Sequence, residues 1–118
     1  YYRNMARVKG GTTPNKRRKN ILAQTKGYRF GRSNKLREAR EAIYHAQLHA
    51  FDHRKDKKGD FRRLWTVRIN AALRPLDMKY NRFIKALSDK NIGLNRKMLA
   101  QLALERPEQF KKVVEATK

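Results

Sequence analysis

Residues 61–74, which read FRRLWTVRINAALR, decide the fold of this 118-residue chain. Apolar side chains recur in this stretch at three- and four-residue steps, the spacing of one helical face, and Pro75 ends the pattern. Arginines stand between the apolar positions. The stretch therefore predicts an amphipathic helix with a core on one side and charge on the other.

The residues that follow predict more short helices. YNRFIKAL, residues 80–87, has the same three- and four-residue steps. Gly93 separates it from a helix that Asn95 is suited to cap, and Pro107 suits the first position of a last helix. No alternating stretch predicts a strand. We expect the aromatic residues of this part in the core: Trp65, Tyr80, Phe83 and Phe110.

The residues before this region predict an extension with two helices. Thr13 and Pro14 suit the start of a short helix over about 13–24. Ser33 is a candidate N-cap for a longer helix over about 34–58, whose apolar stripe is narrow and largely alanine. Such a stripe buries too little area to hold a core unaided.

Gly59 and Asp60 predict the break between two domains, with Asp60 capping the next helix. The expected fold class is all-α. A long basic helical N-terminal extension (1–58) precedes a small helical bundle (59–118).

Charge is distributed unevenly along the chain. The net charge is +21, and residues 1–40 hold thirteen Lys and Arg against one acid, Glu38, for a net +12. Residues 76–118 hold ten bases and five acids, for a net +5. Self-repulsion of this size opposes compaction unless a partner neutralises it, so a polyanion is expected against the N-terminal part.

Other partners and compartments are less compatible with the sequence. The basic segments are poor in the large apolar residues that membrane-surface helices carry, and no apolar run is long enough to span a bilayer. The start has no apolar signal-peptide region, and the absence of cysteine excludes disulfides and thiolate metal sites. We expect no membrane partner.

Nucleic acid is the expected partner, with RNA favoured over DNA. Tyr28 and Phe30 flank Arg29, and aromatic planes among bases are suited to stacking on unpaired nucleotides. The basic bias covers roughly forty residues, more than the five to eight of a localisation signal. Candidate contacts from the residues alone are Lys16, Arg17, Arg18, Lys19, Arg29, Lys35, Arg40, Lys55, Lys57, Lys58 and Arg63.

Catalysis and metal binding find little support. His45, His49 and His53 share one helical face, which raises the alternative of a metal-dependent nuclease. A metal ion there would add positive charge beside Arg54 and Lys55, and no acid pair, nucleophile motif or phosphate-binding glycine loop is present. We expect no enzyme, no cofactor, no metal and no small-molecule substrate.

Several segments together resemble the bacterial-type large-subunit ribosomal protein L20 family. The resemblance rests on MARVKGG (5–11), Ile21-Leu22, Lys26-Gly27-Tyr28 and Arg32-Ser33, and on four longer runs. These runs are FRRLW (61–65), RINAALR (68–74), YNRFIKAL (80–87) and LNRKMLAQLA (94–103). It implies a basic helical extension inside large-subunit ribosomal RNA, a helical domain docked on an RNA junction, and an early assembly factor rather than a catalytic component.

The resemblance also implies contacts to RNA at single positions. In the extension they are Arg7, Lys9, Lys26, Tyr28, Arg32 and Arg54, and in the domain helix they are Arg62, Arg68, Asn70 and Arg74. The sequence departs from the family's dense run of bases at Asp52, His53, Asp56, Gly59 and Asp60, where different contacts are expected.

The sequence thus predicts a structural constituent of the large ribosomal subunit. Its expected partners are ribosomal RNA and neighbouring large-subunit proteins, in the bacterial cytoplasm or an organelle matrix or stroma. The alternative is a free-standing RNA chaperone or a nucleoid-type architectural protein.

Overall fold

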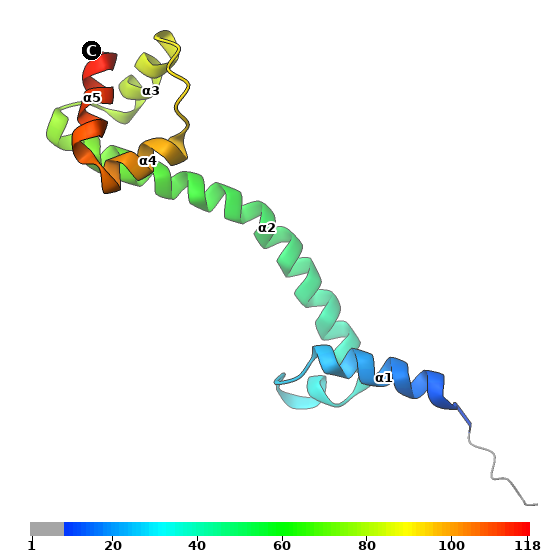
Figure 1. The fold of residues 1–118 in the computed structure, drawn as a ribbon. Coiled ribbons are helices and arrows are strands. Elements are labelled where there is room, and N and C mark those ends of the chain that lie inside the picture. The colour runs from blue at the N-terminus through cyan, green and yellow to red at the C-terminus, as the bar shows by residue number, and fades with distance from the viewer. Residues whose placement is uncertain (1–8) are drawn as a thin grey trace, which may run out of the picture. The chain divides into compact units, whose positions relative to one another are not determined.

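The computed structural model describes residues 9–118, and every regular element within them is helical (Figure 1). The order is α1 (Thr12–Gln24), the 3₁₀ turn η1 (Phe30–Ser33), α2 (Leu36–Leu73), the 3₁₀ turn η2 (Arg74–Leu76), α3 (Tyr80–Asp89), α4 (Arg96–Glu105) and α5 (Pro107–Thr117). The predicted all-α class, a long helix followed by a small helical part, is confirmed. None of the described helices is both long and apolar enough to cross a membrane.

Helix α2 runs for 38 residues, through the point where the sequence predicts a break. The prediction of a long helix that ends near residue 58 is wrong, as is the role of Asp60 as an N-cap. A glycine inside a helix costs only about 1 kcal/mol relative to alanine, and no proline stands beside Gly59 to end the helix. Asp60 instead faces Arg63 one turn on, with 3.6 Å between carboxylate oxygen and guanidinium nitrogen.

The start of α2 also differs from the prediction. Ser33 is not an N-cap: it belongs to η1, where its Oγ donates to the main-chain oxygen of Phe30 at 3.4 Å. The first turn of α2 is closed instead by the amide of Ala39, which donates to the oxygen of Lys35 at 2.9 Å. Helix α1 begins within one residue of the expected position, with Pro14 in its first turn.

Internal contacts divide the chain into two units, with the boundary between His53 and Arg54. The predicted domain limits, 1–58 and 59–118, stay a prediction. In the unit from Arg54 onward, α3, α4 and α5 gather around the C-terminal part of α2 (Figure 1). Its buried core consists of Ile69, Leu73, Phe83, Leu87, Leu99, Ala100, Phe110 and Val114.

The aromatic residues of this core lie as predicted. The rings of Phe83 and Phe110 are fully buried, with centroids 5.8 Å apart. Trp65 and Tyr80 are half-buried and pack against the same core. Such ring pairs add specific geometry to a large burial of apolar surface.

Local chemistry sets the ends of the last helices, as the sequence predicts. Asn95 Oδ1 accepts the amide of Met98 at 2.8 Å and so caps α4, while Pro107 opens α5. Lys90 Nζ donates to the main-chain oxygen of Ala116 at 2.8 Å, which joins the end of α3 to the end of α5.

The unit up to His53 has a smaller interior. Thr25 and Ala39 are buried, and a few apolar side chains of α1 and the start of α2 are half-buried around them. Ala46 and Ala50, further along the predicted alanine stripe, are exposed. The stripe therefore packs only at its N-terminal end.

Candidate nucleic-acid interface

The bases of α1 form an exposed cluster. The run Lys16 to Lys19 places four adjacent cations around the helix, and α1 buries none of its residues. Arg18 Nη2 donates to the main-chain oxygen of Asn34 at 3.0 Å, which ties α1 to the segment before α2. The cluster is accessible to a polyanion from several directions.

The segment between α1 and α2 turns tightly and presents two aromatic rings. Thr25 Oγ1 donates to the oxygen of Leu22 at 3.2 Å, and the amide of Tyr28 donates to the oxygen of Thr25 at 3.1 Å. Gly27 adopts a φ of 85°, which a residue without a side chain tolerates. Tyr28 is 39% exposed and Phe30 is 91% exposed. Both rings are therefore available to a ligand.

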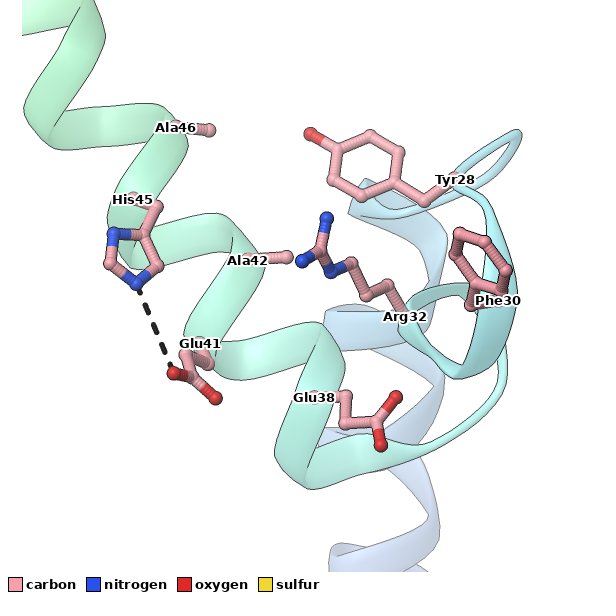
Figure 2. A pocket seen from close by; sticks show the side chains of 8 residues that line it. All are labelled: Tyr28, Phe30, Arg32, Glu38, Glu41, Ala42, His45 and Ala46. Atoms are coloured by element: carbon pink, nitrogen blue, oxygen red, sulfur yellow. Dashed lines mark ion pairs between the residues drawn. The ribbon is translucent and has the colours of Figure 1, made fainter.

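Tyr28 and Phe30 line a hollow of about 610 Å³ in this unit (Figure 2). Its other lining residues are Arg32, Glu38, Glu41, Ala42, His45 and Ala46. Ala42 and Ala46 of α2 contribute only methyl groups to this lining, whereas Glu38, Glu41 and His45 of the same helix contribute polar side chains. The hollow combines aromatic planes, a guanidinium and carboxylates, all of which are groups that recognise nucleotides.

The middle of α2 is exposed on all sides, from Tyr44 to Lys58. Its large apolar side chains include Leu48, 58% exposed, and Tyr44, 63% exposed. Bases are concentrated at its C-terminal end, at Arg54, Lys55, Lys57 and Lys58. Helix α2 therefore presents charge and apolar surface together.

A second hollow, of about 720 Å³, lies in the unit from Arg54 onward and has an aromatic floor and a basic rim. The rings of Phe61 and Trp65 lie 6.3 Å apart between centroids, and Lys57 Nζ stands 5.9 Å from the centre of the Phe61 ring. The rim consists of Arg54, Lys57, Lys58, Arg62 and Lys97. This arrangement suits a planar, anionic ligand.

Sequence reasoning missed two bases at the start of α4. Lys97 lines the second hollow, and Arg96 lines a neighbouring one of about 590 Å³ with Arg62 and Arg63. Two adjacent bases directly after the Asn95 cap were the available signal. Their proximity to α2 depends on the tertiary fold.

The predicted contact residues have one property in common: each one that the structure describes is exposed. Arg7 lies outside the described residues. The structure brings Arg54, Lys57, Lys58 and Arg62 together at one hollow and places Tyr28 and Arg32 at the other. Arg68, Asn70 and Arg74 are exposed on α2 and η2 but line neither.

The histidines are spread along α2. The rings of His49 and His53 lie 5.9 Å apart between centroids, and His45 Nε2 is 3.9 Å from the carboxylate of Glu41, which attracts the ring only when it is protonated. Among residues 9–118, no group of three or more His, Cys, Asp or Glu side chains is arranged to hold a metal ion.

The chain is strongly basic, and across residues 9–118 its regular elements are helical and its Lys and Arg side chains and several aromatic rings are exposed. This combination is typical of proteins built into ribonucleoprotein particles. Residues 7–113 match the family model described as Ribosomal protein L20. The chain belongs to this family of ribosomal proteins, which is not a family of enzymes.

Curated relatives match over nearly their whole length. The chain is 49% identical over 111 residues to "Large ribosomal subunit protein bL20" of Chloroflexus aggregans, covering 94% of this chain and 93% of the relative. The protein of the same name from Mesoplasma florum is 46% identical over 113 residues, covering 96% and 94%. That from Roseiflexus sp. is 49% identical over 111 residues, covering 94% and 95%.

Proposed function

We propose that this chain is a structural constituent of the large ribosomal subunit that binds large-subunit ribosomal RNA directly and supports early assembly. The observation that carries the proposal is the exposure of every predicted contact residue that the structure describes, in a chain of net charge +21. Uncompensated charge of this size repels itself, and RNA phosphates supply the missing anions. Relatives of nearly the same length carry the name of a large-subunit protein.

The two units contribute differently to binding. In the unit up to His53, clustered Lys and Arg side chains neutralise phosphates, so that RNA segments can approach one another closely. In the unit from Arg54 onward, an apolar core holds α2, α3, α4 and α5 in fixed positions, so its basic hollow can fix the register of the RNA. Binding and positioning require no chemical step from the protein.

The proposed partners are large-subunit ribosomal RNA and neighbouring large-subunit proteins, and the proposed location is the ribosome of a bacterium or an organelle. The RNA contacts are the exposed residues predicted from the sequence, together with Arg96 and Lys97 at the start of α4. Each phosphate contact should contribute about −0.7 to −0.9 to the slope of log affinity against log salt.

Association with purified large subunits tests the proposal. We expect the chain to sediment with large subunits at one copy each and to remain bound after a high-salt wash. A free-standing RNA chaperone or a nucleoid-type protein washes off, which would contradict the proposal.

A pair of matched variants locates the contacts. Lys16→Gln with Lys19→Gln removes two charges from α1, and Lys111→Gln with Lys112→Gln removes two exposed charges from α5. We expect the α1 variant to dissociate at lower salt than the α5 variant. Equal salt sensitivity of the two would show that only total charge matters.

A further inference from the structure

The hollow in the unit up to His53 is lined by the carboxylate of Glu38, although residues 1–40 carry a large excess of positive charge. Glu38 is the single acid among residues 1–40, and an acid in a segment that faces RNA repels phosphates. Its position in the first turn of α2 is favourable to the helix dipole, but the dipole does not require the carboxylate to line a hollow. A Cβ added to Gly31 would collide with Glu38 Oε2, so the carboxylate packs closely against η1.

Phe30, which lines the same hollow, is unfavourable both in its exposure and in its backbone conformation. Its side chain is 91% exposed, and its φ of 58° lies in the left-handed region that bulky residues rarely adopt. Strained residues of this kind cluster at binding sites. A flat ligand that stacks on the ring would compensate for its exposure.

The charged side chains that line the hollow point in different directions (Figure 2). The carboxylate of Glu38 points toward the side where Phe30 lies, and the guanidinium of Arg32 lies above it, toward Ala42. The carboxylate of Glu41 turns the other way, to His45. Glu38 is therefore the carboxylate that faces the aromatic side.

We propose that this hollow binds one unpaired guanine nucleotide of RNA, an inference that rests on the proposed function. The base stacks on Phe30 and Tyr28, Glu38 accepts hydrogen bonds from the base edge, and Arg32 pairs with the phosphate. The volume of about 610 Å³ lies within the ~300–1,000 Å³ of small-molecule sites.

Guanine follows from the donors that each base offers. Its Watson–Crick edge carries an N1–H and an N2 amino group side by side, which match the two oxygens of one carboxylate. Adenine and cytosine offer one amino donor beside a ring nitrogen that would repel the carboxylate. Uracil offers a single donor between two carbonyl oxygens.

Two RNA oligonucleotides test the inference with the full chain. Both are single-stranded runs of uridine, and they differ only at the central nucleoside, which is guanosine in one and inosine in the other. Inosine lacks only the N2 amino group, and both carry the same number of phosphates, so non-specific binding is equal. We expect about tenfold tighter binding of the guanine oligonucleotide, because one hydrogen bond to a charged group is lost with inosine.

Variants assign the preference to the hollow. Glu38→Gln should abolish the preference for guanine, while Glu115→Gln, the same charge change on exposed α5, should keep it. Phe30→Ala should weaken binding of the guanine oligonucleotide about tenfold, and Phe30→Tyr should retain it.

The outcomes separate the two proposals. Failure of both oligonucleotides to bind at low salt contradicts RNA binding itself. Equal binding of the two, which is also the result if the hollow receives a protein side chain, overturns the guanine site alone. A preference that survives Glu38→Gln overturns it as well.

Discussion

Replacement of Gly59 by alanine tests the continuity of α2. An alanine Cβ at this position meets no atom within 4 Å, and the backbone of Gly59 is not in the left-handed region. The substitution therefore adds no contact and no strain, and only helix propensity changes. Alanine is favoured over glycine by about 0.8–1.0 kcal/mol in a helix interior.

Hydrogen exchange of the amides on either side of residue 59 measures this gain. A local opening that costs about 1 kcal/mol more occurs roughly fivefold less often, so exchange should slow about fivefold. Far-UV circular dichroism of the full chain should show helix content unchanged or slightly higher. Gly59→Pro is the control of opposite sign, because it removes a hydrogen bond and should cost about 3 kcal/mol.

A helix that continues through residue 59 is refuted if Gly59→Ala leaves exchange unchanged or speeds it. It is refuted equally if Gly59→Pro is tolerated with full helix content, since proline is compatible with a chain that breaks at residue 59. Either result would restore the two separate helices that the sequence predicts.

Three further predictions concern the core, a cap and the RNA contacts. Phe110→Ala empties a fully buried ring position against Phe83 and should cost about 3–5 kcal/mol, measured by chemical denaturation of the full chain; a loss under 1 kcal/mol would contradict this packing. Asn95→Ala removes the acceptor of the Met98 amide and should cost about 1 kcal/mol, whereas Asn95→Asp should cost little; equal losses would exclude capping as the cause. Arg62→Ala should reduce the salt slope of RNA binding by about 0.7–0.9, and an unchanged slope would remove Arg62 from the phosphate contacts.

Much of the fold is predictable because local chemistry and helical periodicity agree. The apolar spacing of residues 61–74 places Ile69 and Leu73 in the core, and Asn95 and Pro107 set helix starts through their own side chains. These features depend on a few neighbouring residues, so the sequence contains them directly.

Other features depend on competition between weak effects. Glycine at residue 59 destabilises the helix by only about 1 kcal/mol relative to alanine. Cooperative helix formation on both sides of residue 59 outweighs this cost. Ser33 has a hydroxyl of the kind that caps helices, but this hydroxyl instead donates a hydrogen bond to the main-chain oxygen of Phe30 within η1. Residue preferences alone therefore predict neither the path of α2 through Gly59 nor the role of Ser33.

The candidate interface, like the fold, was predictable only in part. Exposure of the bases was predictable, because clustered like charges cannot be buried without partners. The hollows were not, since one requires residues 28–32 to turn back toward Glu38 and the other requires Lys97 to approach the rings of Phe61 and Trp65. Both depend on how the chain folds between elements, which helical periodicity does not encode.

Because α2 continues without a break through residue 59, the direction in which each upstream side chain leaves the helix axis is fixed relative to the core. At about 100° per residue, Arg54, Lys58 and Arg62 fall on the side of the helix that carries Trp65, and Asp56 and Asp60 fall on the opposite side. Inserting one residue at position 59 would rotate the upstream bases by about 100° relative to the core, whereas inserting seven would nearly restore their direction. Substitutions in this part of α2 therefore change single side chains, whereas the insertion of one residue changes the direction of all the upstream bases at once.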